Sequence, residues 1–455
     1  MSLDVAARLR LAATLEYLEY DSTASRLATS LAGIEAARLL WLTGKRDRAF
    51  EIASRIHRSG GSEFIARTIE RTLRRGHRLA RSGSKMELWS FYDHYIHQYV
   101  NHPDAAPIVS NPLGLLGYRV LVLKSARPRE RGVLVADYSY IFPLFAALFD
   151  IEAIAQRYLI VLEPSWRGLC TPDVLAYSRF DFPVLIQAVE PRDIKFINTL
   201  QTNLSTVPIA ANWWIDYRPL TPGGVVTRDI DVIVVAAWSA VKRHWRLFRV
   251  LARLRRRGHR LRVALVGYPL DKTRAEIEAE AAHFGVSDQI ELHERIPLAD
   301  VGRLYRHSKL HVLWSRKEGA NRAVIESLFA DVPVVVRRGL SYGYHYPYIN
   351  DHTGAFADED ELGDVLLEMI AARDRYRPRE WALANMTCQQ ATAILEEAVR
   401  KIATAAGEDW TTGLTVKTSR LETQSYWNPN DKSKFEADYA FLAEQLRPPY
   451  RRSSD

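Results

Sequence analysis

Cysteine is scarce in this sequence, which holds only Cys170 and Cys388 among its 455 residues. So few thiols exclude a disulfide framework and a cysteine-rich zinc module, and they are typical of a reducing compartment. No uncharged run reaches the roughly 18 residues that a membrane-spanning helix requires. The N-terminus also lacks the basic-then-apolar order of a secretory signal peptide. We therefore expect a soluble protein of the cytoplasm.

Charge of one sign is only slightly in excess, with Lys+Arg 62 against Asp+Glu 54 and a net charge of +8. This excess suits an anionic small molecule or a lipid headgroup as well as nucleic acid, so it selects no partner. A hydrophobic share of 47% and a charged share of 25% exclude wholesale disorder and a collagen-like fibre. The histidines lack metal-ligand spacing, and no serine has a nucleophile-elbow context. We expect neither a metal site nor hydrolase chemistry.

The order of apolar patterns predicts a helical segment followed by two α/β units. Residues 1–110 carry apolar side chains at helical spacing. Residues 111–224 hold short β-branched runs, of which the first two are close enough to pair as a hairpin. Strands and helices then alternate over residues 225–376, which predicts a parallel, doubly wound sheet. Residues 377–455 return to helices.

The most informative stretch, residues 314–328, follows an apolar strand and opens a helix. Ligands of open α/β sheets collect at that end of the strands. Glu318 and Glu326 each offer a carboxylate, which can accept two hydrogen bonds from vicinal hydroxyls. Gly319 allows a ligand to approach the backbone, and Asn321 is a candidate N-cap for an anion-binding helix start. By pattern alone, the same residues also fit a solvated loop and helix.

Two other strand ends carry candidate ligand contacts. Lys242 and Arg243 follow the strand predicted at 231–236, where their charges would neutralise a diphosphate. Gly267 follows the strand predicted at 261–266, where a missing side chain would admit a flat base or a backbone contact. A solvated basic turn and an ordinary glycine turn explain these residues as well.

In this order, the three pieces resemble the nucleotide-binding half of the GT-B retaining glycosyltransferases of family 4, the glycosyl transferases group 1 domain. The signature of that family is a glutamate, seven residues and a second glutamate, here Glu318 to Glu326, and the resemblance covers residues 228–375. It implies two Rossmann-like domains facing a cleft. It also implies a hexosyltransferase-type enzyme that uses a nucleotide-diphosphate sugar, retains anomeric configuration and needs no metal or other cofactor.

The resemblance also implies roles for single residues. Glu326 would bind the donor ribose, Glu318 the donor sugar and Lys242 the diphosphate, with Glu318 and Lys242 as the catalytic pair. The other donor-binding residues would be Arg243, Gly267, Gly319, Ala320, Asn321 and Arg322. The family usually has an arginine five residues before the lysine, and here that position is Ala237. We expect one of the two arginines in the donor set to supply the missing charge.

The front α/β unit is expected to hold the acceptor, a saccharide, lipid-linked or protein molecule, in the synthesis of cell-surface polysaccharide or glycoconjugate. Its strand-end candidates are Asp137, Glu163, Trp166 and Arg167, although ordinary turns would look the same. Arginines recur at three- and four-residue steps over residues 67–81 and share one helix face. This face either docks peripherally to an anionic inner membrane surface or is simply solvated. No nucleic-acid partner is expected.

Two other functions remain open. The first is a non-catalytic, partner-binding protein with a degenerate transferase domain, which the missing arginine favours and the intact glutamate pair opposes. The second is a nucleotide-sugar epimerase of related fold, which would act without an acceptor. Binding of UDP or GDP would separate the transferase from the first alternative. Product analysis with the donor alone would identify the second.

Overall fold

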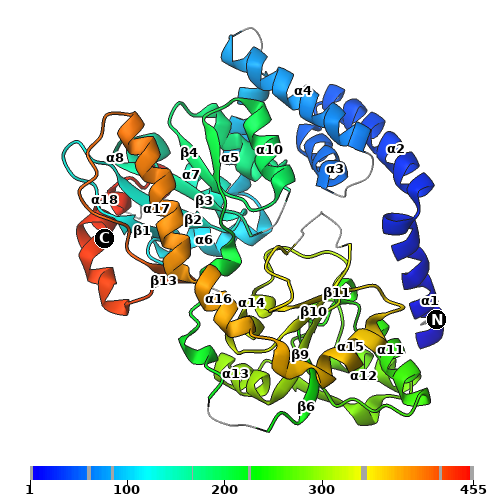
Figure 1. The fold of residues 1–455 in the computed structure, drawn as a ribbon. Coiled ribbons are helices and arrows are strands. Elements are labelled where there is room, and N and C mark those ends of the chain that lie inside the picture. The colour runs from blue at the N-terminus through cyan, green and yellow to red at the C-terminus, as the bar shows by residue number, and fades with distance from the viewer. Residues whose placement is uncertain are drawn as a thin grey trace. The chain divides into compact units, whose positions relative to one another are not determined.

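The protein is described by a computed structural model that covers residues 4–58, 63–83, 87–165, 168–223, 227–339, 346–419 and 423–450. It divides into two compact units (Figure 1). Unit 1 holds Met1–Ser25 and Tyr217–Thr387, and unit 2 holds Arg26–Asp216 and Cys388–Asp455. The predicted α/β class is confirmed, as are the helices of the N-terminal and C-terminal segments. The N-terminal helices are nevertheless shared between the two units.

Unit 1 is built on a six-stranded parallel sheet with the strand order β11-β10-β9-β6-β7-β8. Its strands are β6 (Ile230–Val235), β7 (Val263–Gly267), β8 (Ile290–Glu294), β9 (Ser308–Leu313), β10 (Val334–Arg337) and β11 (Gly354–Ala357). Counted from β6, this is the order of a doubly wound nucleotide-binding sheet, whose direction of winding reverses between β6 and β9. The loops that follow β6 and β9 therefore open at the crevice where such sheets bind ligands.

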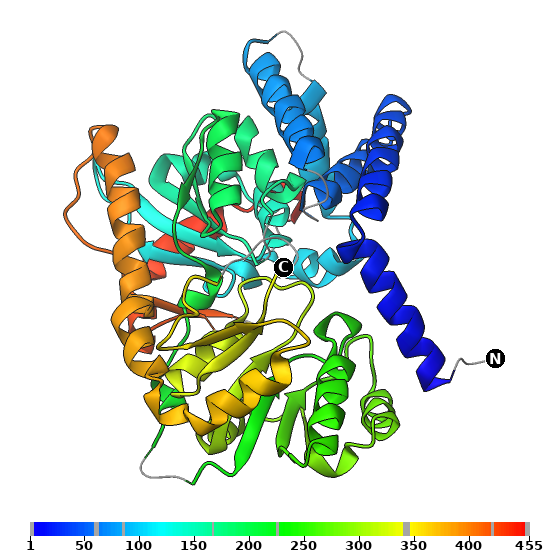
Figure 2. The same cartoon turned by 45° about the vertical axis from the view of Figure 1, so that its right-hand side comes forward.

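Helices flank the sheet of unit 1 (Figure 1). They are α11 (His244–Arg256), α12 (Arg274–His283), α13 (Leu298–His307), α14 (Arg322–Phe329), α15 (Leu362–Ala371) and α16 (Pro378–Asn385). The β-branched residues of the strands pack against α11, α12 and α15 in one buried cluster, which includes Val232, Leu251 and Leu310. The N-terminal helix α1 (Val5–Glu16) and the π-helical turn η1 (Tyr17–Asp21) also belong to this unit. Helix α1 contacts α12 from outside the sheet (Figure 2).

Unit 2 contains a five-stranded sheet whose strands follow the sequence order. They are β1 (Val120–Lys124), β2 (Gly132–Asp137), β3 (Tyr158–Glu163), β4 (Val184–Gln187) and β5 (Leu204–Val207). Strands β1 and β2 form the predicted antiparallel hairpin, and the other neighbours are parallel. A separate antiparallel pair consists of β12 (Lys417–Ser419) and β13 (Gln424–Tyr426).

Helices make up most of the remainder of unit 2. They are α2 (Thr23–Leu42), which begins in unit 1, α3 (Arg46–Arg58), α4 (Glu63–Arg81), α5 (Glu87–Tyr99), α6 (Ala106–Ser110), α7 (Ile141–Leu148), α8 (Ile151–Arg157), α9 (Pro172–Leu175), α10 (Pro191–Leu200), α17 (Cys388–Ala405) and α18 (Glu436–Glu444). The six arginines between residues 67 and 81 are all exposed on α4. Membrane docking through them remains a prediction. In the described ranges, no helix has the length and apolar content to cross a bilayer.

Candidate active site

Lys242 and Glu318 meet at the crevice of unit 1. Lys242 ends the short 3₁₀ turn η7 (Ala240–Lys242) after β6, and Glu318 lies in the loop between β9 and α14. The Lys242 ammonium donates to Glu318 Oε2 at 2.5 Å. Ser315 Oγ donates to the same oxygen at 2.9 Å, and the Gly319 amide donates to Oε1 at 3.2 Å. Both side chains are largely buried, so the ion pair is shielded from solvent.

Hydrogen bonds to main-chain and side-chain atoms fix the two loops that carry this pair. Asp271 accepts hydrogen bonds from Ser239 Oγ at 3.1 Å and from the Ala240 amide at 3.0 Å, which holds the turn that ends at Lys242. The Arg316 amide donates to the Val241 carbonyl at 2.9 Å and so joins the two loops directly. The position of Lys242 relative to Glu318 is therefore set by the Asp271 carboxylate and by the main-chain bond between the two loops.

The start of α14 supplies amide groups beside Glu318. Asn321 is the N-cap, as predicted, and its side-chain oxygen accepts from the Val324 amide at 3.0 Å. Gly319 is buried, whereas Ala320 and Arg322 are half-buried. The Tyr346 hydroxyl donates to the Gly319 carbonyl at 3.0 Å, so this carbonyl points toward Tyr346. The helix start can accept an anion from the direction of Lys242.

Glu326 lies one and a half turns into α14 and is buried with its neighbours. Burial raises the pKa of the Glu326 carboxyl, and the charge of Arg322 lowers it. The Arg322 Nε atom lies 3.7 Å from Glu326 Oε1. A buried carboxylate with one cation nearby can still accept hydrogen bonds from a hydroxylated ligand.

Two residues of the predicted donor set face other groups. Arg243 Nε donates to both carboxylate oxygens of Glu16, at 3.0 and 3.2 Å, and Arg243 Nη2 lies 3.4 Å from Glu359. A Cβ atom on Gly267 would lie 2.2 Å from the Ala236 carbonyl oxygen and 2.7 Å from the indole nitrogen of Trp238. The glycine is therefore required by packing, and the space beside it is filled by protein.

Sequence reasoning missed several residues that support this site. Ser315 and Tyr346 contact Glu318 and Gly319, and Asp271 holds the turn before Lys242. Ser315 lies inside the stretch singled out from the sequence, whereas Asp271 and Tyr346 come from other loops and carry no local signal. Among the residues that the structure describes, no group of three or more His, Cys, Asp or Glu side chains converges on a metal position.

The acceptor-side candidates Asp137 and Glu163 end the neighbouring strands β2 and β3 and lie opposite each other in the register. Both are buried. Arg119 Nη1 donates to Asp137 Oδ2 at 3.2 Å, and Lys417 Nζ donates to Glu163 Oε2 at 2.5 Å. Lys417 comes from the distant strand β12 and was not predicted. Trp166 and Arg167 lie outside the described residues.

We expect Asp137 to make the stability of unit 2 depend on pH. Burial, reinforced by the charge of Glu163, raises the pKa of Asp137 to about 7. The folded protein therefore keeps a proton that the unfolded chain releases near pH 4, so stability is lost as the pH rises from about 4 to about 7. The slope can reach about 1.4 kcal/mol per pH unit. Asp137→Asn should flatten it in urea unfolding at pH 5, 6 and 7.5, and parallel wild-type and variant curves would contradict the prediction.

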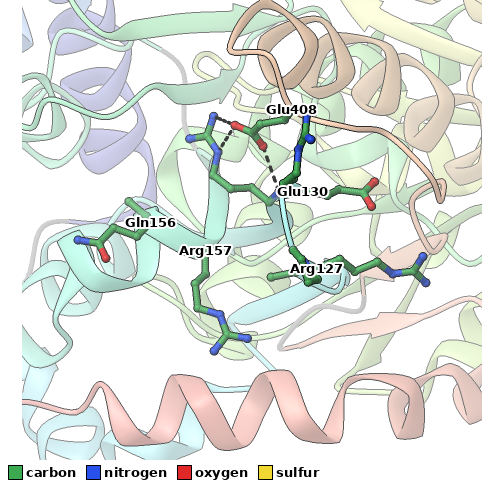
Figure 3. A pocket seen from close by; sticks show the side chains of 10 residues that line it. Arg127, Glu130, Gln156, Arg157 and Glu408 are labelled. Carbon is green, nitrogen blue, oxygen red and sulfur yellow. Dashed lines mark hydrogen bonds and ion pairs between the residues drawn. The ribbon is translucent and has the colours of Figure 1, made fainter.

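A different group of cations lines a surface pocket of unit 2 (Figure 3). Arg127, Arg129 and Arg131 come from the turn between β1 and β2, and Arg157 comes from the end of α8. Arg131 Nε donates to Glu408 Oε1 at 2.6 Å, and Arg129 Nε lies 3.8 Å from Asp409, so two of the four charges have an acidic partner. This pocket is at the amino ends of β2 and β3, so it is separate from Asp137 and Glu163 at their carboxyl ends.

Comparison with family models matches residues 222–374 to glycosyl transferases group 1, which is about a third of the chain. The matched region contains Lys242, Glu318 and Glu326, and the enzyme class that this group indicates is glycosyl transfer. Curated protein sequences gave no match.

Solved structures include weakly similar chains. TarM has 13% identity and a TM-score of 0.46, with 59% of this chain and 54% of TarM covered. The chain thus spans about half the length of TarM. Sucrose-phosphate synthase from Thermosynechococcus elongatus has 12% identity and a TM-score of 0.44, with 60% and 74% covered. Anabaena Alr3699/HepE in complex with UDP has 14% identity and a TM-score of 0.44, with 59% and 79% covered.

Proposed function

We propose that this protein transfers a sugar from a nucleotide-diphosphate donor to a saccharide, lipid-linked or protein acceptor, with retention of anomeric configuration. The observation that carries the proposal is the buried pair of Lys242 and Glu318 at the crevice between β6 and β9, inside the region that matches the glycosyltransferase group. The synthesis of a cell-surface polysaccharide or glycoconjugate is the setting we propose for it.

In this proposal, Lys242 and the first amides of α14 stabilise the leaving diphosphate. Negative charge grows on the bridging oxygen as the bond to the sugar breaks, and groups already oriented toward it cost no reorganisation. The Lys242 ammonium has its position fixed by the turn before it, and the α14 amides are fixed by the Asn321 cap. Both therefore favour the transition state over the bound donor.

Glu318 holds Lys242 before the donor binds and then accepts from hydroxyl groups of the donor sugar. Its two oxygens are engaged by Ser315, the Gly319 amide and Lys242, which fixes the plane of the carboxylate. Once the diphosphate competes for Lys242, Oε2 is left with one donor and can accept another. Glu326, on helix α14, is the proposed partner of the ribose hydroxyls.

We expect Glu326→Gln to weaken nucleotide binding without unfolding unit 1. The wild-type protein should gain about 2.7 kcal/mol of stability from a nucleoside diphosphate at 100 times its Kd. The amide retains the shape of the side chain but loses an acceptor, so the Kd for UDP or GDP should rise about 10-fold or more. Thermal unfolding over a concentration series of each nucleotide measures this change.

Glu278→Gln is the matched control, because Glu278 lies on the exposed face of α12 in the same unit. It should bind each nucleotide as the wild type does. Failure of every nucleoside diphosphate and nucleotide sugar to stabilise the wild-type protein would contradict the proposed function. Binding without transfer to any acceptor, even after prolonged incubation, would instead favour the non-catalytic alternative.

A further inference from the structure

The N-terminal stretch Asp4–Asp21, here called the acidic segment, is bound to the rest of unit 1 largely through charged side chains, and its Tyr20 ring lies against Arg316 and Lys317. Its Glu16 and Asp21 carboxylates contact arginines of the loops after β6 and β9. The arginine cluster is defined as Arg243, Arg246 and Arg316. Arg246 Nη2 donates to Glu16 Oε2 at 2.9 Å, and Arg316 donates to Asp21. One short segment thus supplies two carboxylates to the same group of cations.

A π-helical turn places these two carboxylates on one side of the segment. Residues five apart on an α-helix differ by about 140° around the axis, so they would face different directions. In η1 the Ser22 amide instead donates to the Tyr17 carbonyl at 2.8 Å, a five-residue step typical of a π-turn. The wider turn lets Glu16 reach Arg243 and Asp21 reach Arg316. Such π-turns occur frequently at functional sites.

Glu359 also accepts from Arg243 Nη2 at 3.4 Å and from Arg246 Nη1 at 3.2 Å, but the arginine cluster retains hydrogen-bond donors that none of the three carboxylates uses. Within the described residues, Arg243 Nη1, Arg246 Nε and Arg316 Nε are buried and have no acceptor. Burial lowers the pKa of Arg243, and the charges of Arg246 and Arg316 lower it further, while Glu16 raises it. A ligand with more oxygen atoms than a carboxylate, such as a phosphate group, would satisfy more of these donors.

The acidic segment is weakly packed against the unit that it covers. Leu9 is the only residue of α1 that is buried, whereas Leu11 and Leu15 are 50% and 54% exposed. A cavity of about 480 Å³ lies beside α1, with Leu9, Leu15 and Trp245 among its lining residues. The outer ion pairs, Arg8 with Glu276 and Lys317 with Glu19, are at least partly exposed and are therefore weakened by salt. None of its residues belongs to the buried cluster of the sheet, so the segment can leave without opening that cluster.

The arginine cluster adjoins the candidate active site through the backbone. Arg243 directly follows Lys242, and Arg316 is two residues before Glu318. The Arg316 amide binds the Val241 carbonyl, so the two loops move together. A phosphate in the cluster would therefore bind residues that neighbour the proposed diphosphate contacts in the sequence and belong to the same two joined loops.

We propose that the arginine cluster is a phosphate-binding site that Glu16 and Asp21 occupy as an internal substitute, and that a phosphate ligand displaces the acidic segment from unit 1. The phosphate comes either from the donor itself or from a second phosphorylated molecule. The first case rests on the function proposed above, whereas the second does not.

Hydrogen exchange of the backbone amides in residues 5–21 of the full-length protein tests the displacement. Saturating inorganic pyrophosphate should accelerate their exchange at least 10-fold in the wild type. The double variant E16Q/D21N should exchange at that rate without ligand and should bind pyrophosphate at least 10-fold more tightly in calorimetry. Glu35→Gln, a change on the exposed face of α2, is the control and should behave as the wild type.

The inference is overturned if pyrophosphate leaves the exchange of residues 5–21 unchanged, or if E16Q/D21N matches Glu35→Gln in both measurements. Arg316→Gln should abolish the response to pyrophosphate, and retention of that response would also overturn the inference. Acceleration by pyrophosphate on protein already saturated with UDP or GDP identifies a second phosphorylated molecule, and acceleration by the nucleotide alone identifies the donor.

The same measurements separate this inference from the proposed function. If the protein binds nucleotide but residues 5–21 do not respond to pyrophosphate, the proposed function is supported and the inference is wrong. If residues 5–21 respond to pyrophosphate but the protein binds no nucleotide, the inference is supported and the proposed function is wrong. Glu326→Gln should weaken nucleotide binding and leave the response to pyrophosphate intact.

Discussion

Replacing Lys242 with methionine should lower kcat/KM for sugar transfer by about 10²–10³-fold. The ammonium is the cation nearest to Glu318, and the loop that carries it is held by Asp271 and by the Arg316 amide. Methionine keeps the length of the side chain but cannot stabilise charge on a departing diphosphate. Steady-state rates with the donor identified by thermal stabilisation measure the loss.

Lys309→Met is the matched control for this prediction. Lys309 belongs to the same unit and donates to Asp231 at 2.7 Å, but it lies near the amino ends of β6 and β9. It should change kcat/KM by less than twofold. Lys242→Arg should recover part of the activity, because the charge returns in a different shape. Equal rates for Lys242→Met and the wild type would show that Lys242 takes no part in catalysis.

Replacing Lys417 with methionine should destabilise the protein by about 3–5 kcal/mol. Lys417 is fully buried, donates to Glu163 and Gln424, and lies with its ammonium 4.7 Å from the centre of the Trp214 ring. Without the ammonium, the Glu163 carboxylate stays buried with its charge uncompensated. Urea unfolding followed by tryptophan fluorescence measures the difference in the free energy of unfolding.

A second substitution distinguishes the lost charge from lost packing. The double variant K417M/E163Q removes both charges, so it should recover at least half of the lost stability. Lys401→Met is the surface control, because Lys401 pairs with Glu397 on the exposed side of α17 and should cost less than about 0.5 kcal/mol. A double variant no more stable than K417M would show that the charge pairing is not the cause.

Much of unit 1 could be predicted from its sequence because β6, β7 and β10 are short apolar runs rich in valine or isoleucine. Parallel strands end at one edge of a sheet, so residues that follow β6 and β9 were expected to be close. The contact between Lys242 and Glu318 agrees with that geometry. Strand β11 was not predicted, because Gly354–Ala357 is short and lacks the β-branched run of its neighbour β10.

Contacts between charged groups far apart in the chain could not be predicted in the same way. Glu163 and Lys417 are separated by 254 positions in the sequence. The sequence pattern around each residue does not indicate which residue it pairs with. The apolar stripe over residues 5–18 suggested a helix packed on a core, yet Leu15 in α1 and Leu18 in η1 are exposed. Ion pairs with unit 1 fix that helix instead, and local hydrophobic periodicity carries no information about them.

The chain passes between the two units at residues 25/26, 216/217 and 387/388. During synthesis on the ribosome, the first 25 residues therefore emerge long before the sheet on which they come to lie. Unit 2 is likewise incomplete until Lys417 has been synthesised and can pair with Glu163, although most strands of this unit come earlier in the chain. Neither unit can finish folding before the later part of the chain has been synthesised. We therefore expect both units to finish folding late and at nearly the same time. A fragment cut at the limits of the matched glycosyltransferase region would lack the acidic segment from the start.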